Sequence, residues 1–138
     1  MTVRAGGDRP SSAGTIPRGS PGGDMNLDTL AKRLDLSCKC CWEKLNREVT
    51  GGYTGDLLSD VMANSKAGDI WVTRQVHKNV VAVAALKEHA AVVVVQGAEP
   101  DVDALEKATA EGIPIFTTNK SAFEITGLIH GLLREDKA

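Results

Sequence analysis

The sequence predicts an α/β fold in which a mainly parallel sheet is covered by helices on both faces. Three short apolar segments begin near residues 70, 91 and 113, and segments of helical character separate them. Strands with almost no polar residues are typical of a sheet that is buried on both faces. Their alternation with helices indicates parallel pairing through right-handed crossovers.

The first 24 residues differ in composition from the rest of the chain. Of these residues, 12 are Gly, Pro or Ser, and the apolar residues among them are scattered. Such a segment buries too little apolar surface to offset the entropy that it would lose on ordering. We therefore expect a disordered Gly/Pro/Ser-rich tail over residues 1–24 and a single α/β domain over residues 25–138.

The first part of this domain predicts two helices and two short strands. In residues 27–34, apolar side chains follow the i, i+3, i+4, i+7 spacing of one helix face. Residues 38–42 and 48–50 are short mixed runs that we interpret as strands, the second of them ended by a pair of glycines. Apolar residues at helical spacing then predict a helix within residues 54–64, on which two aspartates four residues apart would share a face.

The middle of the chain contains one ambiguous segment. In residues 79–88, the valines favour a strand, whereas the alanines and the charged end favour a helix. Because Asn79 is a good N-cap residue, we predict a helix there. The apolar segments on which the fold class rests are predicted as strands over residues 70–73, 91–95 and 113–116.

The last two helices carry recognisable end signals. Pro100 and Asp101 begin a helix that Gly112 ends, since glycine readily adopts the left-handed conformation of a helix C-terminus. Ser121 and Glu124 have the spacing of a capping box and predict the start of the final helix.

Polar segments follow the predicted strands and precede the predicted helices. Ligands of open parallel sheets bind beyond the carboxyl ends of the strands, and helix N-termini suit anions. The four segments are residues 50–54, 73–79, 96–99 and 117–121. We predict these ligand contacts: Thr50, Gly51, Gly52, Thr73, Gln75, His77, Asn79 and Gly97. The alternatives are ordinary turns and caps, which we favour for the fourth segment, and a structural polar network within residues 73–79.

Composition excludes several classes of function. With 16 Lys and Arg against 18 Asp and Glu, and few aromatic residues, the chain does not resemble a nucleic-acid-binding protein. No apolar run approaches the roughly 18 residues of a membrane span, so we expect a cytoplasmic protein. Phosphate-loop, dinucleotide-fold and nucleophile-elbow motifs are absent from the sequence. We therefore predict no catalytic residues and no cofactor.

The three cysteines form a Cys38-Lys39-Cys40-Cys41 cluster. Structural zinc sites usually combine a C-x₂-C pair with a second pair of ligands elsewhere. Here the cluster reads C-x-C-C, and the sequence offers no second pair. We therefore predict no metal site and interpret the cysteines as ordinary, mainly buried thiols. Redox sensitivity of the adjacent Cys40 and Cys41 is the alternative.

Several motifs in this order resemble the DRTGG domain family. The motif that gives the family its name corresponds to residues 46–53, with Asn46 at a position where the pattern usually carries Asp. The similarity extends over about residues 27–133. The other matching segments are residues 56–62, 68–73, 77–84, 97–100 and 112–115.

This resemblance implies a fold and a class of function. DRTGG domains are similar to the N-terminal domain of HPr kinase/phosphorylase, and they occur in some pyrophosphatases between paired nucleotide-sensing domains. Stand-alone copies occur near iron-only hydrogenase genes. The resemblance implies a regulatory, often dimeric, ligand-sensing module. It does not imply a kinase, because the kinase's phosphate loop is missing from this sequence.

These observations support three hypotheses of function. The first is a non-catalytic homodimeric module that senses a small anionic metabolite or a nucleotide. The second is a protein-interaction subunit of a hydrogenase-associated complex. The third is a small enzyme acting through His77, which requires a second titratable group beside this histidine in a concave pocket.

Overall fold

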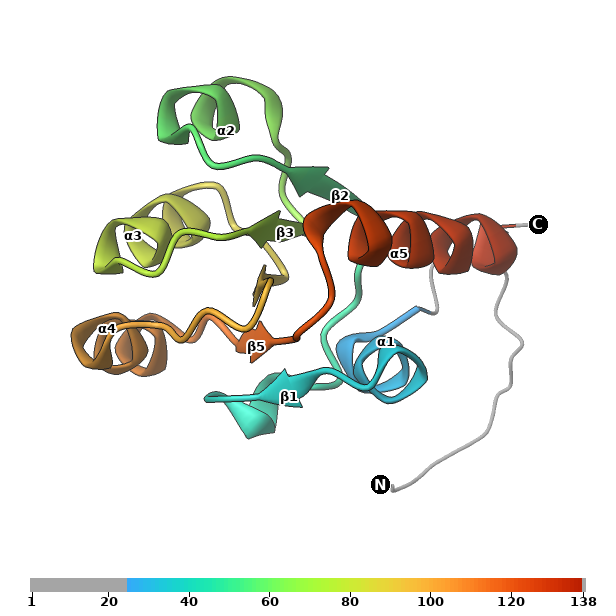
Figure 1. Ribbon diagram of the computed structural model, residues 1–138, viewed down its shortest axis with the longest axis horizontal. Helices are drawn as coiled ribbons and strands as arrows, with labels where there is room; N and C mark the ends of the chain where they lie inside the picture. Colours follow the sequence, from blue (N-terminus) through green and yellow to red (C-terminus); the bar gives the residue numbers. More distant parts are fainter. Residues whose placement is uncertain (1–24, 138) are drawn as a thin grey trace.

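The computed structural model describes residues 25–137, and within them lies one five-stranded sheet of order β1–β5–β4–β3–β2 (Figure 1). Strands β2 to β5 pair in parallel, whereas β1 pairs antiparallel with β5. The α/β fold with a mainly parallel sheet is thus confirmed. The tail expected over residues 1–24 lies outside the described residues. The strands are β1 (Ser37–Cys38), β2 (Gly51–Thr54), β3 (Asp69–Thr73), β4 (Ala91–Val94) and β5 (Ile115–Thr117).

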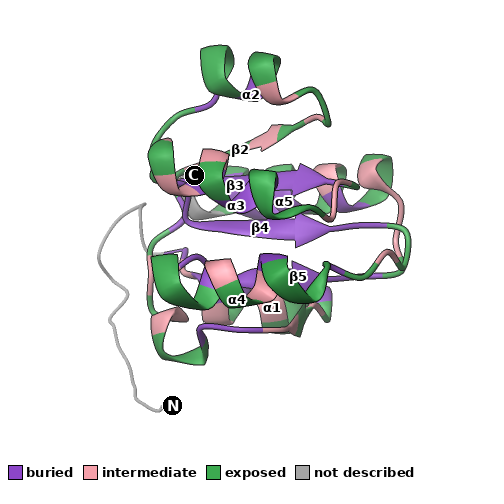
Figure 2. Cartoon of the chain, turned by 90° about the vertical axis from the view of Figure 1, so that its left-hand side faces the viewer, coloured by how far each residue is buried: buried purple, intermediate pink, exposed green. Residues whose placement is uncertain are grey.

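Helices cover both faces of the sheet, and the central strands are buried between them (Figure 2). Helices α1 and α5 lie on one face, and α2, α3 and α4 lie on the other (Figure 1). Side chains alternate accordingly, so that Val72 and Phe116 pack towards α1 and α5 while Trp71 and Val92 pack on the opposite face. The helices are α1 (Leu27–Leu34), α2 (Leu58–Asn64), α3 (Lys78–Leu86), α4 (Val102–Glu111) and α5 (Ala122–Lys137).

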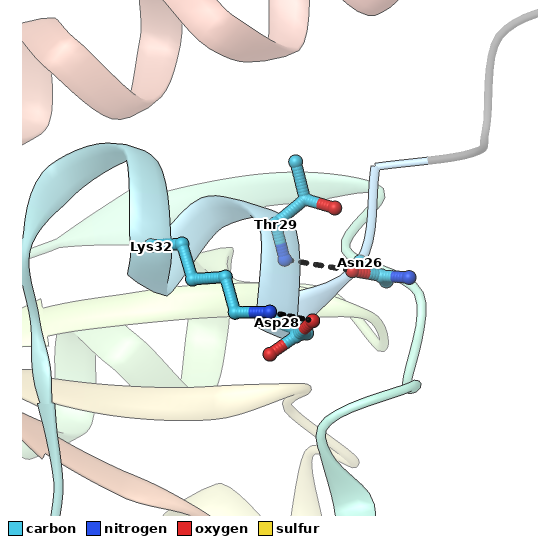
Figure 3. A network of polar contacts seen from close by, with 4 residues as sticks. All are labelled: Asn26, Asp28, Thr29 and Lys32. Atoms are coloured by element: carbon cyan, nitrogen blue, oxygen red, sulfur yellow. Dashed lines mark hydrogen bonds and ion pairs between the residues drawn. The ribbon is translucent and has the colours of Figure 1, made fainter. Parts of the chain in front are cut away.

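Helix α1 has the bounds that the apolar spacing predicts. The side chain of Asn26 accepts a hydrogen bond from the Thr29 N–H at 2.9 Å (Figure 3). One turn of helix on, Lys32 forms an ion pair with Asp28 at 3.0 Å. The predicted ends of two other helices are also confirmed. Gly112 adopts the left-handed conformation after α4, and the Ser121 hydroxyl accepts from the Glu124 N–H at 3.1 Å.

The second strand lies later in the chain than predicted. The two glycines do not end a strand at residues 48–50; they begin β2, where Gly51 pairs with Asp69. A glycine pair in the sequence suggests a turn, but pairing with β3 overrides this weak local preference. Gly51 also has a steric role, because a Cβ there would lie 2.7 Å from a carboxylate oxygen of Asp69.

Three further predictions need correction. The run 38–42 is not one strand, because β1 ends at Cys38. Cys41 then adopts a left-handed conformation, and a 3₁₀ turn follows over Trp42–Lys44. Asp56 lies before helix α2 rather than on its face, since the chain stays extended through Leu57. His77, not Asn79, occupies the N-cap position of α3, and it makes no side-chain capping bond.

His89 forms a buried polar contact just before β4. Its side chain is 2% exposed, its Nε2 lies 2.8 Å from the Ser65 hydroxyl, and its ring meets the edge of Trp71. Its Nδ1 makes no hydrogen bond within residues 25–137. Burial lowers the pKa of His89 below its ordinary value; Lys87 adds to this effect and Asp69 opposes it. His89 is therefore a neutral packing residue.

Candidate functional site

Five of the predicted contacts lie towards one edge of the sheet. Thr73 ends β3, and Gln75, His77 and Asn79 follow it on the loop and first turn of α3. Gly97 lies in the turn that follows β4. The carboxyl edge of the parallel strands therefore gathers these residues, as the topology of such sheets requires.

The other three contacts lie at the opposite edge. Gly51 and Gly52 begin β2, and the N–H of Thr50 donates to the Gly68 carbonyl at 3.1 Å in the turn before β3. The five residues of β3 separate the two edges by roughly 13 Å, since a strand rises about 3.3 Å per residue. The expected placement of the glycine pair between a strand and a helix is therefore wrong. Contact of these three residues with a ligand of their own stays a prediction.

Asp56 organises the loop that follows β3. One of its carboxylate oxygens accepts from the Thr73 hydroxyl at 2.7 Å and from the Arg74 N–H at 2.9 Å. The side-chain amide of Gln75 donates to the main-chain carbonyl of Asp56 at 3.1 Å. Thr73 and Gln75 thus belong to a structural polar network, the alternative interpretation of this segment. The sequence gives no local sign of this role of Asp56, because it depends on the pairing of β2 with β3.

His77 has an acidic neighbour that its sequence spacing does not reveal. Its Nδ1 lies 3.2 Å from a carboxylate oxygen of Asp101, and the Asp101 N–H donates to the Val76 carbonyl at 3.0 Å. The two side chains are 67% and 46% exposed, so water screens the pair. This contact ties the loop after β3 to the start of α4. Asn79 is exposed on the first turn of α3.

A polar pocket of about 360 Å³ opens where β1, β4 and β5 meet at the carboxyl edge, and we call it the β5 pocket. Of the predicted contacts, Gly97 lines it. The Gly97 N–H donates to the Thr118 carbonyl at 3.0 Å, and the Gln96 N–H donates to the Lys120 carbonyl at 2.9 Å. The lining residues are Asp35, Ser37, Lys39, Gly97, Glu99, Thr117, Thr118, Asn119 and Lys120.

Charges in the β5 pocket come from distant parts of the chain. Lys39, just after β1, forms an ion pair with Glu99 at 3.7 Å across the pocket. Lys120 lies before α5, and Asp35 follows α1. Sequence reasoning missed Lys39 and Asp35, because only the antiparallel pairing of β1 with β5 brings them to this edge. Residues 117–120 of the fourth polar segment, interpreted mainly as a helix cap, line the pocket.

The three cysteine side chains do not line the β5 pocket, although Lys39 between them does. Cys40 and Cys41 are buried and Cys38 is half-buried, and all are free thiols. The Cys40 thiol donates to the Ile113 carbonyl just before β5, and the Cys41 thiol donates to the Ala108 carbonyl within α4, each at 3.5 Å. Burial raises the pKa of Cys41 to about 12 and also raises that of Cys38. Within the described part of the chain, no three His, Cys, Asp or Glu residues are placed to hold a metal ion.

Comparison with known proteins identifies the fold. No family model matches the chain, and no curated protein matches it. One similar solved structure contains the CBS and DRTGG domains of the regulatory region of Clostridium perfringens pyrophosphatase, complexed with the activator diadenosine tetraphosphate. Its TM-score is 0.63 at 17% identity over 78% of this chain.

This chain has a DRTGG-like fold. It spans about half of its structural neighbour, because the match covers 46% of that chain. The solved neighbour is described as the regulatory region of its pyrophosphatase. No helix within residues 25–137 is long and apolar enough to cross a membrane.

Proposed function

We propose that this protein is a non-catalytic, ligand-sensing module of the DRTGG family that binds a nucleotide or a similar small anionic metabolite. The observation that carries the proposal is the polar β5 pocket at the carboxyl edge of a parallel sheet, the usual ligand position in such folds. The similar regulatory region binds a nucleotide activator, which supports the same class of ligand.

The described side chains favour binding over catalysis. The buried thiol of Cys41, with its pKa raised to about 12, stays protonated near neutral pH and is a poor nucleophile. His77 and Asp101 are open to solvent and lie outside the β5 pocket. Asp56 is engaged by Thr73 and Arg74. The groups that line the β5 pocket are suited to hydrogen bonding and charge pairing.

A thermal-shift series on the full chain tests the proposal. The ligands are AMP, ATP, diadenosine tetraphosphate, acetyl phosphate and NAD, with adenosine as the uncharged control. A ligand at a hundred times its Kd stabilises the folded state by about 2.7 kcal/mol, so micromolar binders register clearly at millimolar concentration. We expect at least one anionic ligand to raise Tm while adenosine does not. If none of them raises Tm at millimolar concentration, the sensing proposal is wrong.

A specific surface supports self-association as part of this function. Phe123 is 92% exposed and Leu128 is 40% exposed, beside a shallow groove of about 650 Å³ along α5. A Thr54–Thr126 hydroxyl contact at 2.7 Å fixes α5 against β2, the edge strand of the sheet. Large exposed apolar side chains of this kind mark interaction surfaces.

The pattern along α5 fits a second copy of the same chain. We propose an antiparallel pairing about a two-fold axis at Gly127, which would place Phe123 of one copy against Gly131 of the other. A Cβ at either glycine would meet nothing within 4 Å, so both positions are open. The same register would bring the Glu124 carboxylate of one copy beside the His130 imidazole of the other. Such an isologous contact is the commonest form of homodimer.

Sedimentation equilibrium tests this dimer. Phe123→Ser is expected to convert the protein to monomer, while Leu86→Ser, on the other face and 69% exposed, leaves the dimer intact. Both variants should fold because neither side chain is buried within the chain, although Phe123→Ser should lose the stabilisation that dimerisation adds. A monomeric wild type, or equal behaviour of the two variants, would exclude this interface. Association with a hydrogenase complex stays a prediction, to be tested by pull-down from the native host.

A further inference from the structure

We propose that the β5 pocket is a phosphate-binding site, and that the ligand it takes is a phosphomonoester with a hydroxyl-bearing carrier, such as a nucleoside monophosphate. This inference rests on the proposed function and goes deeper, because it assigns the ligand class and the residues that hold it. Of the predicted ligand contacts, it retains Gly97 alone.

Thr117 provides an observation that points to a ligand. Its side chain is 7% exposed and lines the pocket at the end of β5. Within residues 25–137 its hydroxyl makes no hydrogen bond, whereas the hydroxyl of the adjacent Thr118 accepts from the Lys120 N–H at 3.2 Å. The oxygen itself is not among the buried unpaired atoms of the described residues, so this hydroxyl is open to the pocket. An anionic oxygen in the pocket would accept the bond that Thr117 can donate.

Lys120 brings an unpaired positive charge to the same pocket. The Lys120 side chain lines the pocket and takes part in no ion pair among the described residues. Helix α5 begins at Ala122, and its first residues line the groove beside Thr54 rather than the β5 pocket, so the cation of the pocket is the Lys120 side chain itself. A free ammonium group and a hydroxyl donor both suit a phosphate oxygen.

The opposite wall restricts the ligand. Glu99 is paired with Lys39 at 3.7 Å, and Asp35 adds a second carboxylate. The four charged side chains of the lining cancel, so the pocket favours one phosphate over a polyphosphate chain. The carboxylates instead suit ligand hydroxyl groups as hydrogen-bond acceptors. At about 360 Å³, the pocket is at the small end of the range for ligand sites and has room for a nucleoside monophosphate.

The backbone holds the pocket in shape without a ligand. Gln96 and Gly97 both have positive φ, at 61° and 71°, and their N–H groups bond to the loop that follows β5. The turn after β4 is thus joined to the segment that carries Thr117 and Lys120. A site that is already formed loses little entropy on binding a small ligand.

Calorimetric titration of the full chain with AMP, inorganic phosphate and adenosine tests the assignment. We expect AMP to bind, phosphate to compete with it, and adenosine to show no binding. Lys120→Gln is expected to weaken AMP binding about tenfold, and Thr117→Val several-fold, because each removes a hydrogen bond to a charged group. Lys78→Gln removes an exposed cation of the same edge from outside the pocket, and it should leave the affinity unchanged.

The outcomes separate this inference from the proposed function. If AMP binds with the same affinity to wild type, Lys120→Gln and Thr117→Val, the β5 pocket is not the site, although ligand sensing stands. If a polyphosphate binds and AMP does not, the ligand class is wrong. If no anionic ligand binds, both proposals fall. Should Thr117→Val fail to fold, Lys120→Gln and its control Lys78→Gln decide the question alone.

Discussion

Adjacent glycines in β2 provide a matched test of packing. A Cβ on Gly51 would lie 2.7 Å from an Asp69 carboxylate oxygen, whereas one on Gly52 would meet Ile70 atoms at ordinary distances of 3.5 and 3.6 Å. Asp69 is 7% exposed, and its other oxygen accepts from the Lys66 N–H at 2.8 Å. The carboxylate therefore has little freedom to move away from a methyl group at position 51.

The expected energies follow from this difference. Overpacking at Gly51→Ala costs about 1–3 kcal/mol, less about 0.4–1 kcal/mol from the restricted unfolded chain, which leaves roughly 1–2 kcal/mol of destabilisation. Gly52→Ala causes no such overpacking and only restricts the unfolded chain, so it should be neutral or slightly stabilising. For a domain of this size, Tm should fall by about 4–8 °C in Gly51→Ala alone.

Urea denaturation of both variants, with Tm from circular dichroism, measures these changes. In an Asp69→Ala background, the destabilisation by Gly51→Ala should disappear because the clashing oxygen is gone. Equal losses of stability at both glycines, or a loss that persists without Asp69, would refute the steric reasoning. Loss of ligand affinity in both variants, without loss of stability, would instead favour a binding role for the glycine pair.

Other predictions concern titration, thiol reactivity and the turn after β4. Because the folded-state pKa of His89 lies below 6.5, the unfolded chain binds the proton first. The free energy of unfolding should therefore fall as pH drops below about 6.5, and His89→Leu should flatten this urea-melt profile. Iodoacetamide at pH 8 should label the half-buried Cys38 before Cys41, as peptide mass spectrometry would show. Gly97→Ala should lower the unfolding free energy by about 1–2 kcal/mol in urea melts, because φ is 71° there.

Much of the fold could be predicted because its signals are local. The apolar runs of β3, β4 and β5 and the Leu spacing of α1 each identify an element without reference to the rest of the chain. Strand β2 has no such local signal, since its glycines have low strand propensity and form a strand only beside β3. Strand β1 is two residues long and is defined by its partner β5.

The candidate site was harder to predict, because its residues are brought together by contacts between distant parts of the chain. The polar ends of the strands could be found from sequence, and the parallel topology places Thr73, Gln75 and Gly97 at one edge. Which groups face an open pocket depends on long-range pairing. Asp56 reaches Thr73 only through the β2–β3 register, and Lys39 reaches Glu99 only because β1 lies on β5.

The pairing of β1 with β5 has a consequence for synthesis of the chain. Helix α1 and β1 are made before α5 and β5, yet α1 packs against α5 and β1 pairs with β5. The apolar face of α1, formed by Leu27, Leu30 and Leu34, is thus not fully covered until α5 has been made. During that interval the nascent chain presents a helix-sized stretch that chaperones can hold, and the domain closes in a single late step.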